Sequence, residues 1–277
     1  MIMQKIMFND RYGLTKAVID GKKTQTRRPF SKADMKVLEE INLKPEDKSL
    51  MQYIIDSYSR YKVGETVAVA QSYETIYKAM SELPEEEFEH PRFHIKNIDN
   101  LIKEARSTKV KDILDAVDRQ LGRNKKDLQI KGEKDAIVKS KSYKNFFIDN
   151  YYNAMYCSEE NKAGWKNKMF VKAEFMPRQI RITDIRLERL QDISDEDCLA
   201  EGIRRWADEK EYASNNTIRK SVDELKAAGY DAYAIPECWS CFASPRAAYA
   251  ALIDKVSGKG TWEKNPWVFV YEFELVK

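Results

Sequence analysis

Two adjacent arginines, Arg27 and Arg28, close a polar run that begins at Lys22 and stops at Pro29. A guanidinium carries several N–H donors in one plane, which suits a phosphate or the edge of a base. The same pair is equally typical of surface ion pairs, which contribute little to stability. The two arginines therefore indicate either an anion-binding site or an ordinary charged surface.

Recognition of single-stranded RNA also needs aromatic side chains that stack on the bases. Tyr73, Trp262 and Trp267 are the candidates. Aromatic residues in strands more often lie in the core, so Tyr73 and Trp267 are predicted to bind substrate only if they face a cleft.

A Cys-x-x-Cys pair, Cys238 and Cys241, and the two histidines of the chain, His90 and His94, offer a metal site. Together the four side chains would satisfy a tetrahedral zinc ion. Their order is unlike that of a zinc finger, and the separation is long. A packed loop with reduced thiols is therefore favoured, and neither a metal nor another cofactor is expected.

The composition limits the classes of function. The 277 residues contain 48 basic and 45 acidic side chains, a net charge of +3 that argues against generic coating of DNA. No apolar run is long enough to span a bilayer, and the first residues do not resemble a signal peptide. With only four cysteines, a reducing cytoplasm is the simpler expectation.

The first part of the chain predicts a helix over 10–20, ended by Gly21, and a strand over 66–77. Charged residues are dense from 78 to 168, where a helical period over 110–121 predicts a helix. This region is interpreted as a mainly helical insertion whose lysine-rich stretch, 122–142, forms a loop.

Strands and capped helices return after residue 168. We predict strands over 169–175, 178–190 (with a bulge near Thr183) and 267–276, and helices over 194–202, 217–228 and 244–258. The pattern indicates an α+β protein, in which 1–77 and 169–277 form a mixed β-barrel with flanking helices around the insertion 78–168.

Four segments together resemble the ASCH domain family, in the larger version common in phage and prophage genomes. Spread over both ends of the chain, they are 21–28 (Gly-Lys-Lys-Thr-Gln-Thr-Arg-Arg), 63–67, 176–193 leading into 200–202, and 260–273. The resemblance implies a barrel related to the PUA domain, a fold associated with RNA and modified nucleosides. Some small members are similar to amidohydrolases that deacylate N4-acetylcytidine, and another is a ribonuclease.

The chain also departs from the family. Members of this size carry Trp-Val-Arg-Glu-Thr-Trp on the second strand, where this chain has Ala-Val-Ala-Gln-Ser-Tyr from Ala68 to Tyr73. If relatives bind ligand through that arginine and glutamate, this chain lacks one cation and one carboxylate. Its substrate preference, or its activity altogether, then differs from theirs.

The amidohydrolase pattern of the family falls on Lys23, Thr26 and Glu201. Amide hydrolysis needs a nucleophile, a base and a donor to the oxyanion. Thr26 would supply the hydroxyl, Lys23 the base, and Glu201 would orient Lys23 or activate water. Desolvation lowers and a nearby carboxylate raises the pKa of a lysine, so the sequence leaves the net direction open. In an extended segment Lys23 and Thr26 point to opposite faces, and a turn must re-aim one of them.

The expected ligand is a nucleoside, a nucleotide or RNA, bound through Thr24, Arg27, Arg28, Tyr73 and Trp267. Two alternatives stay open: a non-catalytic RNA-binding module, and a phage-associated protein whose insertion binds another protein and whose cleft is vestigial. The trio itself also fits two solvated turn residues and a polar helix end.

Overall fold

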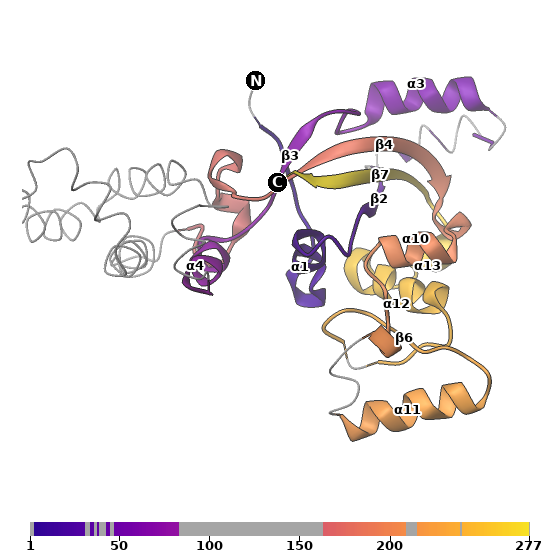
Figure 1. Ribbon diagram of the computed structural model, residues 1–277. Coiled ribbons are helices and arrows are strands. Elements are labelled where there is room, and N and C mark those ends of the chain that lie inside the picture. The colour runs from indigo at the N-terminus through magenta and orange to yellow at the C-terminus, as the bar shows by residue number, and fades with distance from the viewer. Residues whose placement is uncertain are drawn as a thin grey trace, which may run out of the picture. The chain divides into compact units, whose positions relative to one another are not determined.

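The computed structural model describes residues 3–30, 34–35, 38, 43–44, 47–82, 163–208, 215–238 and 240–276 (Figure 1). It divides into a first unit (1–6, 68–179 and 277) and a second unit (7–67 and 180–276). The predicted helix over 110–121, the predicted loop over 122–142, and His90 and His94 lie outside the described residues. The protein is α+β, as predicted.

Hydrogen bonds join five strands in the order β1-β3-β4-β7-β2. They are β1 (Lys5–Ile6), β3 (Thr66–Val69), β4 (Gln179–Arg189), β7 (Trp267–Val276) and β2 (Gln25–Pro29). β1 pairs with β3 in parallel and β2 with β7 antiparallel, so the sheet is mixed. Within the described residues β1 and β2 are its open edges, and the closed barrel expected from the sequence is not seen.

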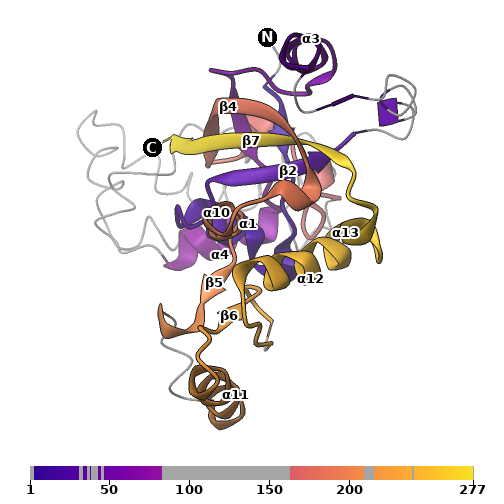
Figure 2. The same cartoon turned by 90° about the vertical axis from the view of Figure 1, so that its right-hand side faces the viewer.

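In the second unit, helices lie on two sides of the strands β4, β7 and β2 (Figure 2). α3 (Lys48–Tyr58) lies beyond β4, and α1 (Leu14–Ile19), α10 (Asp195–Ala200) and α12 (Pro245–Ser257) lie beyond β2. In β7, the middle strand of the three, the first five residues, from Trp267 to Tyr271, are all buried. A strand covered on both faces loses the alternation of polar and apolar residues.

Capping residues place the helices that pack below the sheet. The Ser194 hydroxyl accepts from the Asp197 N–H at 3.0 Å and starts α10. Ser244 does the same for Ala247 at 3.1 Å and starts α12, with Pro245 as its first residue. Both starts agree with the sequence prediction, because a serine oxygen satisfies an N–H that has no partner within the helix.

A smaller cluster occupies the far part of the second unit. Here β5 (Arg204–Arg205) pairs with β6 (Tyr233–Ala234), and α11 (Asn216–Ala227) packs on them. The remaining described elements of the unit are α13 (Thr261–Lys264) and 3₁₀ turns at 10–12, 190–192 and 206–208. The apolar core of the cluster consists of Trp206, Ile218, Val222, Ala232 and Ala234. The predicted helix over 217–228 is thus confirmed.

Strand β4 confirms the predicted change of register. Ile180 and Ile182 are buried, Thr183 and Asp184 are both exposed, and burial resumes at Ile185. Two successive exposed side chains shift the buried face by one residue, as a bulge in that position does.

Two strand predictions in the first unit were wrong. The predicted strand over 66–77 ends at Val69, and helix α4 (Tyr73–Glu82) follows, because the Ser72 hydroxyl accepts from the Thr75 N–H at 3.1 Å and caps the new helix.

The predicted strand over 169–175 is instead two 3₁₀ turns, Lys168–Phe170 and Ala173–Phe175. The ammonium group of Lys5 donates to the carbonyl oxygens of Lys168, Met169 and Val171 at 3.2, 2.6 and 2.8 Å. Carbonyls that converge on one cation cannot alternate between two neighbouring strands.

Candidate functional site

The segment that follows α1 is held by backbone hydrogen bonds at both ends. Gly21 has a φ of +69°, a left-handed conformation that ends the helix, and the N–H groups of Lys22 and Lys23 both donate to Ala17 O at 2.8 and 2.9 Å. The Thr24 N–H donates to Ala200 O at 2.9 Å. These bonds place Lys23 against the C-terminal end of α10.

Lys23 forms a buried ion pair with Glu201, which is 178 residues later in the chain. The Lys23 Nζ lies 2.5 Å from Glu201 Oε2 and donates to the Glu201 carbonyl at 2.7 Å. The two residues are 2% and 4% exposed. Gly202 follows with a φ of +103°, and a Cβ there would lie 3.6 Å from the Lys23 Cβ. The sequence prediction that these two residues belong to one site therefore has a geometric basis.

Burial lowers the pKa of Lys23 because a charged ammonium group loses its hydration. The Glu201 carboxylate raises the pKa in opposition, and Arg28 and Arg27 lower it further. The net direction is downward. The competition that the sequence leaves open is thus decided in favour of desolvation, which moves the lysine toward the neutral form that a base requires.

Arg27 lies at the centre of a group of carboxylates, and its side chain is fully buried. Its guanidinium contacts Asp197 at 2.6 Å, Glu188 at 3.0 Å and Glu201 at 3.3 Å, and it donates to Gln25 Oε1 at 2.6 Å. The positive charge of Arg27 is thus neutralised by carboxylates of the protein rather than kept for an anionic ligand. Arg27 therefore fixes the second oxygen of Glu201 while Lys23 holds the first.

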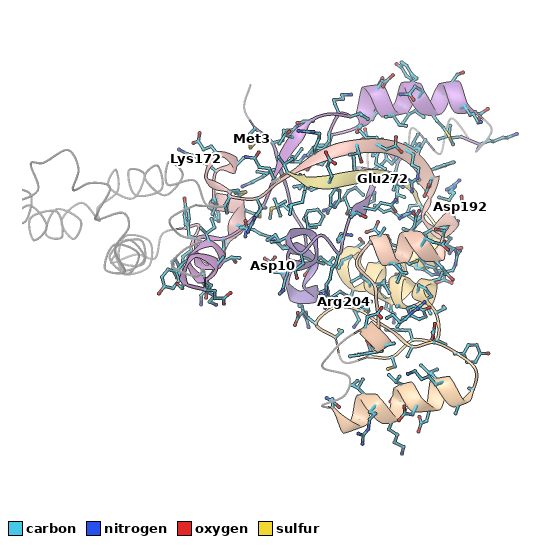
Figure 3. The ribbon with its side chains drawn as sticks, viewed as in Figure 1. Met3, Asp10, Lys172, Asp192, Arg204 and Glu272 are labelled. Atoms are coloured by element: carbon cyan, nitrogen blue, oxygen red, sulfur yellow. The ribbon has the colours of Figure 1, made fainter. Side chains whose placement is uncertain are left out.

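Arg186 on β4 extends this group toward the surface. It donates to Glu188, to Glu272 and, at 3.0 Å, to Asp197 (Figure 3 shows Glu272). We call the set of Lys23, Gln25, Arg27, Arg186, Glu188, Asp197, Glu201 and Glu272 the charged network. Three cations and four carboxylates nearly balance within it.

Two carboxylate–guanidinium contacts set the protonation of Asp197. Partial burial raises its pKa, but the hydrogen bond from Arg27 and the charges of Arg27 and Arg186 lower it more, and the net pKa lies below the ordinary value of 3.8. Asp197 thus stays ionised at neutral pH and holds Arg27 in place.

Two buried polar atoms beside Glu201 have no hydrogen-bond partner among the described residues: Tyr249 Oη and Arg27 Nε. Burial, followed by the Glu201 carboxylate, raises the pKa of Tyr249 well above 10.0. Tyr249 therefore offers a buried, neutral hydroxyl group whose O–H has no acceptor among the described residues.

Thr26 and Thr24, which were also predicted from the first motif, form no hydrogen bond with the side chains of the ion pair. Thr26 is 4% exposed and pairs with Tyr271 across the ladder, on the strand face opposite to Gln25 and Arg27. Its hydroxyl makes no hydrogen bond with Lys23 or Glu201. Thr24 is exposed at the surface.

Arg28 is half-buried and belongs to the same strand face as Thr26. It donates to the Met7 carbonyl and lies 5.5 Å above the centre of the Phe8 ring. Burial lowers its pKa, opposed by Tyr61, Glu201 and Tyr271. Its side chain is thus held by backbone and an aromatic face rather than by a carboxylate.

Tyr73 belongs to the first unit, whereas the charged network belongs to the second. It is 1% exposed at the start of α4, and its N–H donates to Gly164 O at 3.1 Å. A Cβ at Gly164 would lie only 2.5 Å from the Tyr73 ring. Tyr73 therefore packs directly on a glycine backbone, and its predicted contact with a substrate stays a prediction.

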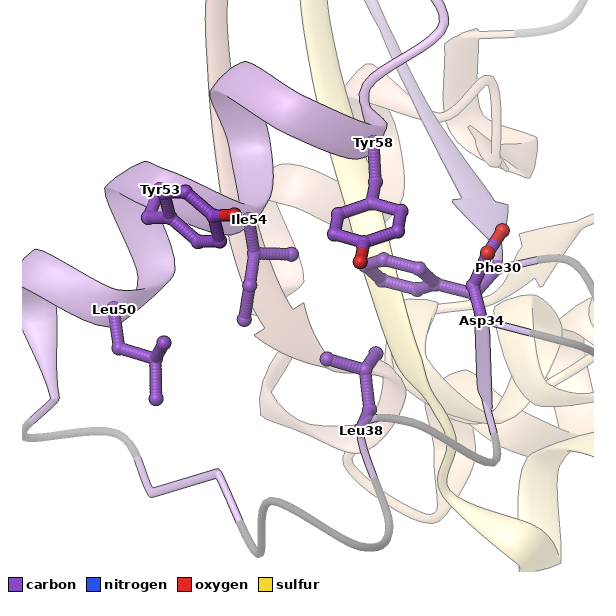
Figure 4. A pocket seen from close by; sticks show the side chains of 7 residues that line it. All are labelled: Phe30, Asp34, Leu38, Leu50, Tyr53, Ile54 and Tyr58. Atoms are coloured by element: carbon purple, nitrogen blue, oxygen red, sulfur yellow. The ribbon is translucent and has the colours of Figure 1, made fainter.

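Trp267 lies at the opposite end of the β2–β7 ladder from the Lys23–Glu201 pair, in a pocket of about 480 Å³. A second cavity, of about 40 Å³, lies under α3 between Phe30, Leu38, Ile54 and their neighbours (Figure 4). Its lining is mostly apolar and its volume admits little more than a water molecule. Of the two, only the Trp267 pocket has the size of a small-molecule site.

The predicted zinc ligands are only partly described. Cys238 and Cys241 are free thiols, and burial raises the pKa of Cys241. Among the described residues no group of three side chains of the metal-binding types comes together. Since His90 and His94 are not described, zinc binding stays a prediction. No helix among the described residues has the length and hydropathy needed to cross a membrane.

The sequence analysis did not identify four residues in or beside the charged network: Arg186, Glu188, Asp197 and Tyr249. Arg186 and Glu188 are alternate residues of β4 and face the same side, a pattern that the sequence does contain. The sequence marks Asp197 only as a residue at the start of a helix. Nothing in the sequence distinguishes Tyr249 from any other aromatic residue of an amphipathic helix.

Three comparisons, with protein-family models, with curated proteins and with solved structures, gave no match to this chain.

Proposed function

We propose that the protein is an ASCH-domain amidohydrolase with a PUA-like ancestry, and that it removes the acyl group from an N-acylated nucleoside such as N4-acetylcytidine. The observation that carries the proposal is the buried Lys23–Glu201 ion pair, whose two residues come from distant parts of the chain. The resemblance of segment 21–28 and of Glu201 to the amidohydrolase pattern supplies the substrate class.

In this proposal Lys23 is the general base. Its Nζ takes a proton from a water molecule, the water oxygen attacks the acyl carbon, and the C–N bond breaks as the proton passes to the departing amine. Burial supports this role because it lowers the pKa of Lys23. Glu201 positions the Lys23 Nζ through its carboxylate and its carbonyl.

Arg27 and Tyr249 would complete the reaction centre. Arg27 is a positioning residue, since it holds Glu201 Oε1 at 3.3 Å. Tyr249 offers a buried, neutral hydroxyl with no partner among the described residues, which suits a donor to the oxyanion. Water is preferred to Thr26 as the nucleophile because the Thr26 hydroxyl faces away from the network. Lys23 is 2% exposed, so the segment that carries it has to open for the substrate.

The test is hydrolysis of N4-acetylcytidine and related N-acylated nucleosides, followed by chromatography of the released nucleoside. We expect Lys23→Met, which keeps the side-chain length, to lower the rate about 100-fold or more, the contribution of a general base. Thr26→Val should retain activity if water is the nucleophile. Lys16→Met, at an exposed site on α1, is the matched control.

Each variant is first checked for folding by circular dichroism. Turnover by the wild type that Lys23→Met loses and Lys16→Met keeps supports the proposal. A folded wild type that hydrolyses none of these nucleosides, or a Lys23→Met variant with full activity, overturns it. Salt-dependent RNA binding without turnover would favour the non-catalytic alternative.

A further inference from the structure

The pocket beside Trp267 is separate from the charged network. The five paired positions of the β2–β7 ladder run from Gln25 with Glu272 to Pro29 with Val268, about 13 Å at the usual rise of a strand. Lys23 precedes the first pair and Trp267 follows the last. A ligand in the Trp267 pocket therefore has no contact with the proposed catalytic base.

One wall of the pocket is a stack of an arginine on a tryptophan. The guanidinium carbon of Arg189 lies 4.6 Å from the centre of the Trp267 ring, within the range of a cation–π contact. Trp267 is 4% exposed, whereas Arg189 is half-buried, so the guanidinium is the more accessible layer of the stack.

A loop preorganises this stack. Arg189 donates to the Asn265 carbonyl at 3.3 Å, and the Asn265 side chain accepts from the Gln191 N–H at 2.8 Å. Asn265 has a φ of +45°, a left-handed conformation that asparagine tolerates better than most residues. The guanidinium of Arg189 is thus held by a backbone carbonyl and by the Trp267 ring. A planar cation held in this way is a surface on which a flat ring can stack.

The charged side chains among the described lining residues of the pocket are both cations. Arg189 and Lys264 line it, and no carboxylate occurs among its described lining residues. Neither cation forms an ion pair with a described residue, in contrast to Arg27 and Arg186. The rest of the described lining is Thr261 and an apolar wall of Met35, Leu38, Leu43 and Pro266. Two unneutralised cations beside an apolar wall suit a ligand that is flat and anionic.

We propose that this pocket is a nucleotide-binding site, with the base stacked on the Arg189–Trp267 pair and the phosphate at Lys264. Its volume of about 480 Å³ falls within the range of small-molecule sites. The site goes beyond the proposed hydrolase activity, since it uses none of the residues of the charged network. The nucleotide is either free or part of a single-stranded RNA.

Isothermal titration of the full chain tests the site with four probes: cytidine 5′-monophosphate, cytidine, inorganic phosphate and a single-stranded RNA hexamer. We expect the monophosphate to bind more tightly than cytidine or phosphate alone, because only it engages both the stack and the cation. Lys264→Ala should weaken binding about tenfold, the effect of losing one charge-assisted hydrogen bond.

Lys259→Ala is the matched control, because Lys259 is also exposed and close in sequence but does not line the pocket. Arg189→Met should abolish detectable binding of the monophosphate, and a cooperative thermal unfolding transition shows that the fold survives. Tight binding of the hexamer alone, weakened by Lys264→Ala, assigns the site to RNA rather than to a free nucleotide.

Three outcomes overturn the proposal: no binding of either nucleotide probe, equal binding of phosphate and monophosphate, or equal losses in Lys264→Ala and Lys259→Ala. The heat of binding does not depend on turnover. A chain that binds the monophosphate and hydrolyses nothing refutes only the hydrolase, and the reverse result refutes only this site.

Discussion

The two ends of the β2–β7 ladder use the same type of side chain in opposite ways. At one end Arg27 is fully buried and contacts three carboxylates. At the other end Arg189 is half-buried, stacks on Trp267 and forms no ion pair with a described residue. The charge of Arg27 is therefore neutralised by carboxylates of the protein, whereas no described carboxylate neutralises the charge of Arg189.

The difference teaches that an arginine is a candidate for anion binding only when its charge is uncompensated. Arg27 belongs to a polar motif that suggests phosphate binding, yet the structure surrounds it with Glu188, Asp197 and Glu201. Arg189 belongs to no such motif. Burial in a low-dielectric interior demands neutralisation, and partial exposure does not.

The largest expected effect comes from exchanging each arginine for methionine. Arg27→Met removes a buried cation from among three carboxylates, and we expect the free energy of unfolding to fall by about 3–5 kcal/mol. Arg189→Met should cost about 1 kcal/mol or less, because a partly exposed cation–π contact is weak. Urea denaturation monitored by circular dichroism measures both.

Equal losses of unfolding free energy in Arg27→Met and Arg189→Met would contradict the contrast drawn between the two arginines. A third variant, Arg181→Met, is the control for removal of a surface arginine, because Arg181 pairs with Glu274 at 3.4 Å with both side chains about half exposed. It should change stability by roughly 0–1 kcal/mol.

The next effect concerns the coupling of Lys23 and Glu201. Lys23→Met leaves Glu201 with Arg27 as its one remaining cation, and Glu201→Gln leaves Lys23 without its carboxylate. Each substitution should therefore destabilise the protein by about 2–4 kcal/mol. The double variant should lose clearly less than the sum of the two single losses. A double-variant cycle by urea denaturation gives the coupling, and simple additivity would contradict the pair.

Raising the pH offers a second measure of this pair. The pKa of Lys23 is lower in the folded protein than its ordinary value of 10.5. As the pH rises, the folded protein therefore releases this proton at a lower pH than the unfolded chain does. Stability conferred by this group should therefore rise with pH between the folded pKa and 10.5. In Lys23→Met that rise should be absent.

The sequence predicted much of the second unit because its signals are local. Ser194, Ser244 and Pro245 place two helix starts through single hydrogen bonds, and the bounds of β7 follow from its own residues. Two strand predictions in the first unit failed because Ser72 and Lys5 redirect the backbone. The effect of Lys5 depends on residues more than 160 positions away, which no local pattern contains.

Only those residues of the candidate site that belong to a family motif could be predicted from the sequence. Lys23 and Glu201 were paired through the family resemblance, and the structure joins them at 2.5 Å. The same motif suggested Thr26, but alternation along β2 turns its hydroxyl to the other face. The carboxylates around Arg27 come from β4 and α10, so their convergence depends on the fold rather than on spacing along the chain.

The smallest expected effect is the acid dependence of Asp197. Its pKa is lowered in the folded state, so the stability that it contributes is present above pH 3.8 and is lost as the pH falls through the folded pKa. The side chain is a quarter exposed, and we expect a contribution of about 1 kcal/mol after solvent screening. Urea denaturation from pH 6 to pH 2.5 should show Asp197→Asn less stable than the wild type at the upper end, with a difference that shrinks as the pH falls below 3.8. Asp195→Asn, on the exposed side of the same helix, should show a smaller difference at pH 6.

If Asp197→Asn and Asp195→Asn behaved alike, the contacts of Asp197 with Arg27 and Arg186 would contribute no more than a solvated carboxylate does. The contrast between the two ends of the ladder would then rest on Glu188 and Glu201 alone.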